Sequence, residues 1–202
     1  MTPGIVGFHV LHVCTGNIGR SPMAERIMRH HLAAVLGERA NVFRVDSAGT
    51  WGHSGSGLEA DAGAVLEAMG VDAAEFAARE LAADQVAAAD LVLTATTEHR
   101  STVVGLVPAA IGRTFTLREF ARLATAVAPH LSDLSDPAAR ARAAVPAAFR
   151  ERGAAAGTVS PGDDDVADPI GAPRAFYVAR AAEIDAACAR AVALFAGGGR
   201  LQ

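Results

Sequence analysis

One short segment constrains the fold more than any other: an apolar run that leads directly into a glycine-containing loop and then a helix. Residues Phe8 to Val13 form a short, mainly apolar run with β-branched members, which predicts a buried strand. The loop CTGNIGRS follows, and Ser21 and Pro22 provide an N-cap and a first residue for a helix that ends at Gly37. A strand, loop and helix in this order are typical of parallel sheets covered by helices.

The rest of the chain continues this alternation. Further strands are expected at 42–45, 90–94 and 113–116, and helices at 58–69, 84–89, 97–106, 117–126 and 177–195. The pattern predicts an α/β sandwich of three layers, with a central parallel sheet of about four strands and right-handed crossovers. We expect one domain over 1–202, with an insertion around 136–165 that contains a helix from Pro137 to Arg152 and a mobile remainder.

Composition argues against several classes of protein. With 51% hydrophobic and 20% charged residues the chain is globular, and its formal net charge of −4 gives no general attraction to nucleic acid. No apolar run reaches the ~18 residues that span a bilayer, and the N-terminus does not resemble a signal peptide. Two cysteines, Cys14 and Cys188, make no disulfide framework, so we expect a cytoplasmic protein without a membrane or nucleic-acid partner.

Cys14 and Arg20 bracket the sequence CTGNIGR, a Cys-x5-Arg spacing at the start of the predicted helix. Backbone N–H groups there can surround an anion, and Gly16 and Gly19 are expected to allow the backbone angles this requires. Arg20 can bind two phosphate oxygens, and the same positive field favours the thiolate of Cys14, a nucleophile for phosphoryl transfer through a phosphocysteine. The alternative is a buried structural Cys beside an unrelated Arg, and the strand, the glycines and the Ser-Pro helix start argue against it.

Four segments resemble the low-molecular-weight protein tyrosine phosphatases of bacteria, in particular actinobacterial ones. VCTGNIGRSPMAE resembles their phosphate loop, DSAGTWGHSG their second strand and its loop, ADLVLT their middle strand, and DPIGAPRAFY their acid loop and last helix. The resemblance covers most of the chain apart from 136–165. It implies a flavodoxin-like sheet, no metal or other cofactor, hydrolysis of phosphotyrosine in protein substrates, and inorganic phosphate as product and inhibitor.

The resemblance also implies roles for single residues. Cys14 is the nucleophile and Arg20 the phosphate clamp, while Asn17 and Ser47 hold the loop and Ser21 stabilises the thiolate. The substrate- and phosphate-binding residues expected on this basis are Thr15, Gly16, Asn17, Ile18, Gly19, Ser21 and Ser47, with Trp51 as one wall of the substrate cleft.

A departing phenolate needs a proton, which a carboxylic acid above the site can supply. Asp168 matches the family's acid by position, because DPIGAPRAFY continues into the C-terminal helix. Asp136, also followed by proline, is the competing candidate, and a plain Asp-Pro turn is the structural alternative for both. We favour Asp168, since Asp136 opens the insertion.

Several positions depart from the family's pattern. Gly19 stands where many relatives have a second loop cysteine, and Ile170 and Gly171 stand where many have aromatic residues after Asp-Pro. Phe76 aligns with the family's loop-supporting histidine. Ile18 stands where related arginine phosphatases carry Thr, and an apolar side chain there favours an aromatic phosphotyrosine ring over a guanidinium.

Two other functions stay open. An arsenate reductase of the same fold could use Cys14 with a small-molecule thiol, although Asp168 favours a phosphatase because arsenate reduction has no leaving group to protonate. A phosphate-binding module without catalysis is a third alternative, but binding alone needs no nucleophile. Five of the seven histidines show no metal-ligand spacing and are expected at the surface or in packing: His12, His30, His31, His53 and His99.

Overall fold

A parallel sheet of four strands forms the centre of the computed structural model, which describes residues 7–51, 53–154, 160 and 162–197. The strands lie in the order β2-β1-β3-β4, and every pairing between neighbours is parallel. Their bounds are β1 Phe8–Cys14, β2 Phe43–Gly49, β3 Leu91–Thr94 and β4 Thr114–Thr116. The predicted α/β class and four-stranded parallel sheet are confirmed.

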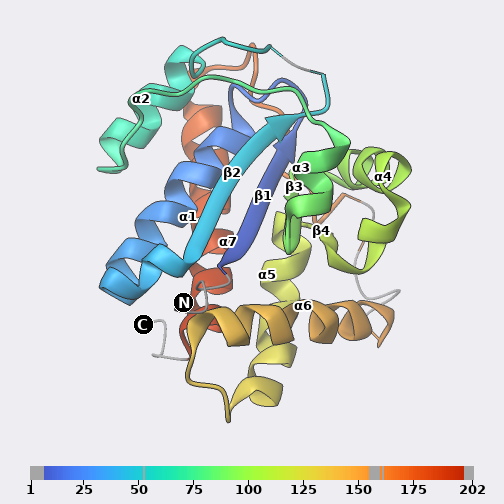
Figure 1. Cartoon of the computed structure of the whole chain (residues 1–202). Coiled ribbons are helices and arrows are strands. Elements are labelled where there is room, and N and C mark those ends of the chain that lie inside the picture. The colour runs from blue at the N-terminus through green and yellow to red at the C-terminus, as the bar shows by residue number, and fades with distance from the viewer. Residues whose placement is uncertain (1–6, 52, 155–159, 161, 198–202) are drawn as a thin grey trace, which may run out of the picture.

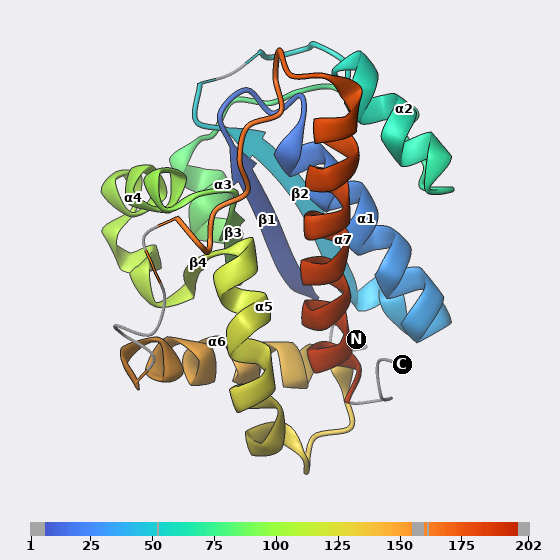
Figure 2. The same cartoon turned by 180° about the vertical axis from the view of Figure 1, so that it is seen from behind.

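Helices cover both faces of this sheet, as Figures 1 and 2 show. The α-helices are α1 Arg20–Leu36, α2 Ala60–Ala68, α3 Ala83–Ala88, α4 Thr97–Leu106, α5 Leu117–Val127, α6 Pro137–Ala154 and α7 Arg174–Ala196. Short 3₁₀ turns follow three of them: η1 Gly37–Val42, η2 Pro108–Arg113 and η3 Ala128–Leu131. Helices α1, α5 and α7 lie on one face of the sheet, and α3 and α4 lie on the other.

The side chains of β1 divide between two hydrophobic clusters because successive strand residues point to opposite faces. Phe8 and Val10 pack in the larger cluster, with α1, α5, α6 and α7. Leu11 and Val13 pack in the smaller cluster, with residues of α3 and α4. Burial on both faces explains why β1 is mainly apolar, and β1 is one of the two central strands of the sheet.

The segment at 136–165 contains α6, so the helix predicted at 137–152 is confirmed. Figure 1 shows α6 crossing the lower end of the molecule, and Arg140 on it is 4% exposed. Its guanidinium donates hydrogen bonds to the carbonyl oxygens of Leu194 (3.0 Å), Leu134 (2.9 Å) and Leu131. The mobile remainder stays a prediction, and its residues 155–159 and 161 lie outside the described part of the chain.

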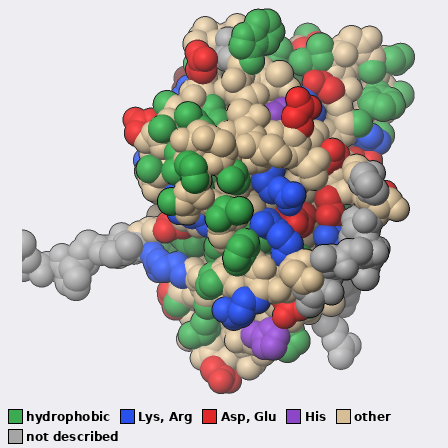
Figure 3. Space-filling view, turned by 90° about the vertical axis from the view of Figure 1, so that its right-hand side faces the viewer, with side chains coloured by type: hydrophobic (Ala, Val, Ile, Leu, Met, Phe, Trp, Pro, Cys, Tyr) green, Lys and Arg blue, Asp and Glu red, His purple; other side chains and the backbone are tan. Residues whose placement is uncertain are grey.

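Within the described residues, no helix combines the length and the apolar character needed to cross a membrane. On the face in Figure 3, arginine side chains and acidic side chains lie beside one another. That mixture agrees with the net charge of −4, which gives no general attraction to an anionic partner.

Candidate active site

The loop between β1 and α1 turns its carbonyl groups outward. Five of these carbonyl oxygens accept a hydrogen bond from a backbone N–H group elsewhere. The pairs are Thr50 to Cys14 (2.8 Å), Trp51 to Thr15 (3.0 Å), His53 to Gly16 (3.4 Å), Glu59 to Ile18 (2.9 Å) and Met23 to Gly19 (3.0 Å). In a trans peptide the carbonyl of one residue and the N–H of the next point in opposite directions. The loop's N–H groups therefore face inward, at the N-terminus of α1, and form a cradle suited to an oxyanion.

Cys14 is the last residue of β1, and its side chain is buried. Its Sγ lies 2.9 Å from the Oγ of Ser21. The predicted role of Ser21 as N-cap is wrong, because α1 begins at Arg20 with Gly19 as N-cap and no side chain caps it. The hydroxyl of Ser21 contacts the sulfur instead, and lies 3.3 Å from the carbonyl oxygen of Ala48.

The guanidinium of Arg20 is buried and held by three partners. Its Nη2 donates to Thr15 Oγ1 (3.1 Å) and to Asp168 Oδ2 (2.5 Å), while Nη1 donates to the carbonyl oxygen of Val166 (3.2 Å). These contacts fix the plane of the guanidinium beside the cradle, which is the geometry that bidentate phosphate binding requires.

The segment before α7 is attached to the carboxyl end of β3, and this attachment positions Asp168. The N–H of Val166 donates to the carbonyl oxygen of Ala95 (2.8 Å), and the N–H of Thr97 donates to Asp165 Oδ1 (2.8 Å). The side chain of Asp168 is 44% exposed, so its carboxylate contacts Arg20 while remaining open to solvent. The structure thus brings the predicted acid to the clamp and the loop of the predicted nucleophile.

Asp136 lies elsewhere. It directly precedes α6, and its Oδ2 accepts a hydrogen bond from the N–H of Ala139 (2.7 Å), as a capping residue does. Helix α6 lies at the end of the sheet opposite to the phosphate loop (Figure 1). Asp136 therefore has a local structural role at the start of a helix.

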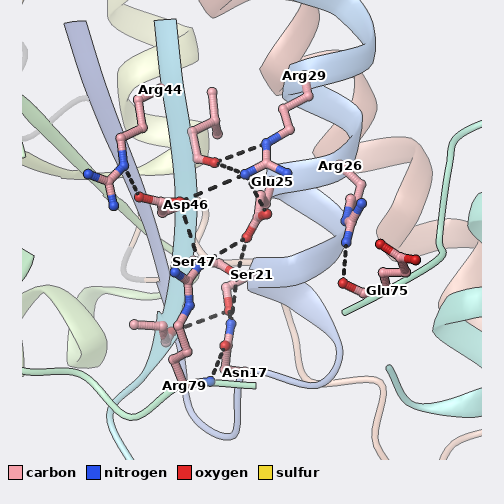
Figure 4. Close-up of polar contacts among 12 residues, drawn as sticks. Asn17, Ser21, Glu25, Arg26, Arg29, Arg44, Asp46, Ser47, Glu75 and Arg79 are labelled. Carbon is pink, nitrogen blue, oxygen red and sulfur yellow. Dashed lines mark hydrogen bonds and ion pairs between the residues drawn. The ribbon is translucent and has the colours of Figure 1, made fainter. Parts of the chain in front are cut away.

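Asn17 holds the loop in shape from inside. Its φ of 55° is left-handed, whereas neither Gly16 nor Gly19 has a positive φ. Gly19, with φ −125° and ψ −91°, still lies outside the regions that other residues favour. Asparagine tolerates the left-handed region because its short side chain bonds locally. Its Nδ2 donates to Ser47 Oγ (2.8 Å), the contact that the resemblance implied, and also to Ser21 Oγ (2.9 Å) (Figure 4).

The remaining atom of the Asn17 amide is held by a residue that sequence analysis missed. Its Oδ1 accepts a hydrogen bond from the backbone N–H of Arg79 (2.8 Å). Phe76 takes no part in this support, and its ring lies 5.9 Å from the guanidinium carbon of Arg26. The backbone N–H of Arg79, three residues after Phe76, thus donates the hydrogen bond that supports the loop.

The close approach of β2 to the loop explains why residue 49 is a glycine. A Cβ at Gly49 would lie 2.4 Å from the carbonyl oxygen of Thr15 and 2.9 Å from the N of Asn17. Backbone atoms cannot move aside as a flexible side chain can, so glycine is required at this end of β2.

The rim carries apolar side chains. Ile18 is half-buried, whereas Trp51 is 72% exposed and its indole makes an edge contact with His53 at 5.9 Å between ring centres. The backbone of Trp51 is tied to the loop through Thr15, as described above. The role of Trp51 as a wall of the cleft stays a prediction.

His99 belongs to the site, although the sequence reading placed it at the surface or in packing. Its Nε2 lies 2.9 Å from Thr15 Oγ1 and its Nδ1 lies 2.7 Å from Thr96 Oγ1. Burial, with the charge of Arg20, lowers the pKa of His99 to about 4, so the ring is neutral at pH 7. These residues line a cavity of about 260 Å³ together with Arg20 and Asp168. The missed signal is the position of Thr96 and His99 directly after a buried strand, where parallel sheets form sites.

No group of three or more His, Cys, Asp or Glu side chains among the described residues is arranged to hold a metal ion. The donors that gather at the site are amide N–H groups, hydroxyls and a guanidinium, which are partners for an anion.

The comparisons with known proteins agree with this geometry. A model of the low molecular weight phosphotyrosine protein phosphatases matches residues 9–152, so the match ends before Asp168. The phosphatase Etp of Escherichia coli (strain K12) is 36% identical over 105 residues, which cover 52% of this chain and 66% of that protein. A protein-arginine-phosphatase of Geobacillus stearothermophilus is 32% identical over 130 residues, covering 64% of this chain and 78% of that protein.

The solved structures extend the likeness over nearly the whole chain. The low molecular weight protein tyrosine phosphatase of T. tengcongensis superposes with a TM-score of 0.64 at 26% identity, covering 91% of this chain and 97% of that one. Because the family match spans most of the sequence, from β1 into α6, and the fold agrees throughout, this chain belongs to the low molecular weight phosphotyrosine protein phosphatase family.

Proposed function

We propose that this chain is a protein tyrosine phosphatase that hydrolyses phosphotyrosine through a phosphocysteine intermediate, without a metal or other cofactor. One observation carries the proposal. Cys14, the last residue of β1, lies at the amide cradle, and at the rim of this cradle Arg20 contacts Asp168 at 2.5 Å. A nucleophile, an oxyanion clamp and a proton donor within one loop cluster are the three groups that ester cleavage needs.

In the first step the thiolate of Cys14 attacks phosphorus, and the P–O bond to the tyrosyl oxygen breaks. The amide cradle and Arg20 bind the three equatorial oxygens, where negative charge is spread in the transition state. Asp168 donates its proton to the departing phenolate. The hydroxyl of Ser21, 2.9 Å from Sγ, stabilises the thiolate before attack.

In the second step water attacks the phosphocysteine, the S–P bond breaks, and inorganic phosphate is released. Asp168, now a carboxylate, accepts the proton of that water by microscopic reversibility. Its partly exposed side chain supports both roles, since it faces the clamp and solvent at once.

Phosphotyrosine is our proposed substrate because the rim carries two apolar side chains in addition to Arg20 and Asp168. The half-buried Ile18 and the exposed indole of Trp51 offer surface to an aromatic ring, whereas a phosphoguanidinium needs polar partners. The two cysteines of the chain are both free, which supports action in the reducing cytoplasm.

The test is the substitution Cys14→Ser. We expect it to abolish turnover of para-nitrophenyl phosphate and of phosphotyrosine peptides while phosphate binding, measured by calorimetry, stays within about threefold, because the cradle and Arg20 remain. Rapid acid quench of the native protein with substrate should trap phosphate on Cys14, detected by mass spectrometry.

Parallel assays separate the alternatives. Persistent turnover by Cys14→Ser would contradict the proposal. Faster hydrolysis of phosphoarginine peptides than of phosphotyrosine peptides would move the substrate class to arginine, and reduction of arsenate with a small thiol, without phosphatase activity, would favour the reductase.

A further inference from the structure

A buried carboxylate, Glu25, stands behind the phosphate loop and has no place in the mechanism above. It lies on α1, and it is 3% exposed. Its Oε2 accepts a hydrogen bond from Ser47 Oγ at 2.6 Å, while its Oε1 lies 2.9 Å from Arg29 Nη2. The Nη2 of Arg79 lies 3.8 Å from Oε2 (Figure 4). Two guanidinium groups therefore hold a full negative charge in place inside the protein.

An ionised carboxylate can only accept hydrogen bonds, and this fixes the direction of each bond that follows. Ser47 must give its one proton to Glu25, so its lone pairs face Asn17. The Nδ2 of Asn17 then donates one proton to Ser47 and the other to Ser21. At the opposite side, the N–H of Arg79 can only donate, and it holds Oδ1 of Asn17.

The direction matters at the far end of the chain of bonds. Because Ser21 Oγ accepts from Asn17, its own proton is left for one of two acceptors, the sulfur of Cys14 at 2.9 Å or the more distant carbonyl oxygen of Ala48 at 3.3 Å. If Asn17 turned its oxygen toward the two serines, Ser21 would give that proton to Asn17 and leave the thiolate without a donor. The N–H of Arg79 would then face the amide NH2 of Asn17, donor against donor.

We propose that Glu25 is a positioning residue that, through Ser47 and Asn17, keeps the hydroxyl of Ser21 directed at the Cys14 thiolate. The proposal rests on the proposed function for its consequence in catalysis, but the orientation of Ser21 and the ionisation of Cys14 can be measured without turnover. Asp46 is the other acidic group in this cluster, 3.8 Å from Arg29 and 3.6 Å from Arg79. It makes no contact with Ser47 or Asn17 among the hydrogen bonds of the described residues.

The test substitutes Glu25→Gln. The carboxamide of glutamine has one oxygen, whereas Glu25 accepts from two donors, Ser47 and Arg29. The carboxamide therefore either turns its NH2 group toward Ser47 or gives up the hydrogen bond from Arg29. We expect the pH midpoint of Cys14 alkylation by iodoacetamide to rise by about one pH unit, which is tenfold slower alkylation below the midpoint. For turnover, kcat should fall while the KM for para-nitrophenyl phosphate stays within about twofold, because the cradle is unchanged.

Glu119 provides a matched control. It is also a buried glutamate, 4% exposed, and it is held by two arginines, with Arg100 at 3.0 Å and Arg152 at 2.8 Å. Its contacts join α4, α5 and α6, and none of its hydrogen bonds among the described residues reaches the phosphate loop. Glu119→Gln should therefore lower the melting temperature about as much as Glu25→Gln and leave the alkylation midpoint unchanged.

A second variant tests the route. Ser47→Ala removes the link without touching Glu25, and it should raise the midpoint as Glu25→Gln does. In the Ser47→Ala background, Glu25→Gln should add less than about a threefold further change, as expected for groups acting in series. This variant also keeps the test intact if Glu25→Gln does not fold.

Three outcomes would overturn the proposal: an unchanged midpoint in Ser47→Ala or in folded Glu25→Gln, an equal shift in Glu119→Gln, or fully additive shifts in the double variant. A native protein that hydrolyses no phosphate ester but shows the predicted midpoint shifts would refute the proposed function alone.

Discussion

At the scale of single residues, Gly19 separates this chain from relatives with two loop cysteines. Its φ of −125° lies outside the left-handed region, and a Cβ added there would meet nothing within 4 Å. The other thiol, Cys188, is fully buried on α7 and lies 3.7 Å from the carbonyl oxygen of Ala24. Burial, with the charge of Asp185, raises the pKa of the Cys188 thiol. No reactive thiol is therefore available to Cys14 within the loop.

We predict that peroxide inactivates the native protein irreversibly, because the sulfenic acid of Cys14 is oxidised further before a thiol can condense with it. In the Gly19→Cys variant, dithiothreitol added after a peroxide pulse should restore most of the lost activity. Gly19→Ala is the matched control, since it makes the same backbone change without a thiol.

Mass spectrometry of the Cys14 peptide distinguishes sulfinic acid from disulfide. Full recovery of native activity, with a Cys14–Cys188 peptide or a mixed disulfide with a small thiol, would show that another thiol resolves the sulfenic acid. The mixed disulfide would also strengthen the reductase alternative.

At the scale of elements, β1 carries a buried histidine two residues before Cys14, on the same face of the strand. His12 is 1% exposed, and its Nε2 has no hydrogen-bond partner among the residues that the structure describes. Burial, with the charge of Arg29, lowers the pKa of His12 to about 3. The folded protein therefore keeps His12 neutral at pH values where the unfolded chain binds a proton.

The sign of the pH effect follows from that difference. Between pH 6.5 and about 3 the unfolded state binds more protons, so the free energy of unfolding decreases as the pH falls, by up to about 1.4 kcal/mol per pH unit. We predict that His12→Leu removes this part of the acid destabilisation, measured by urea unfolding across the pH range. His130→Leu, at an exposed histidine, should leave the slope unchanged; an equal effect of both variants would contradict the assignment to His12.

Periodicity along the chain predicts most elements, because strands and helices follow from local patterns of burial. The helix expected at 97–106 is the one observed, and the strand expected at 42–45 extends to Gly49. The supporting residues of the site could not be predicted in this way. Thr15 and His99 are 84 positions apart, and Asn17 and Arg79 are 62 apart. Such contacts depend on how strands β1, β2 and β3 are placed side by side, which no local pattern contains.

At the scale of the whole molecule, the two Asp-Pro sequences lie at opposite ends of the sheet. Asp168 contacts the clamp, whereas Asp136 starts α6 (Figure 1). We predict that Asp168→Asn lowers kcat by roughly 10²–10⁴-fold for phenyl phosphate, since general acid catalysis contributes about that much. The loss should shrink for dinitrophenyl phosphate, whose leaving group needs no proton.

Asp136→Asn is the control, because asparagine also caps helices and kcat should stay near that of the native protein. A large loss of kcat in Asp136→Asn together with a small one in Asp168→Asn would reverse the assignment of the acid.

The ion pair between Arg20 and Asp168 gives the unliganded site an internal anion. In the proposed mechanism a substrate phosphate takes the place of this carboxylate on the guanidinium. The step that binds the phosphate therefore also releases the proposed acid from its cation, at the moment when the leaving group arrives beside it. One ion pair would thus link phosphate binding to the freedom of the acid to move.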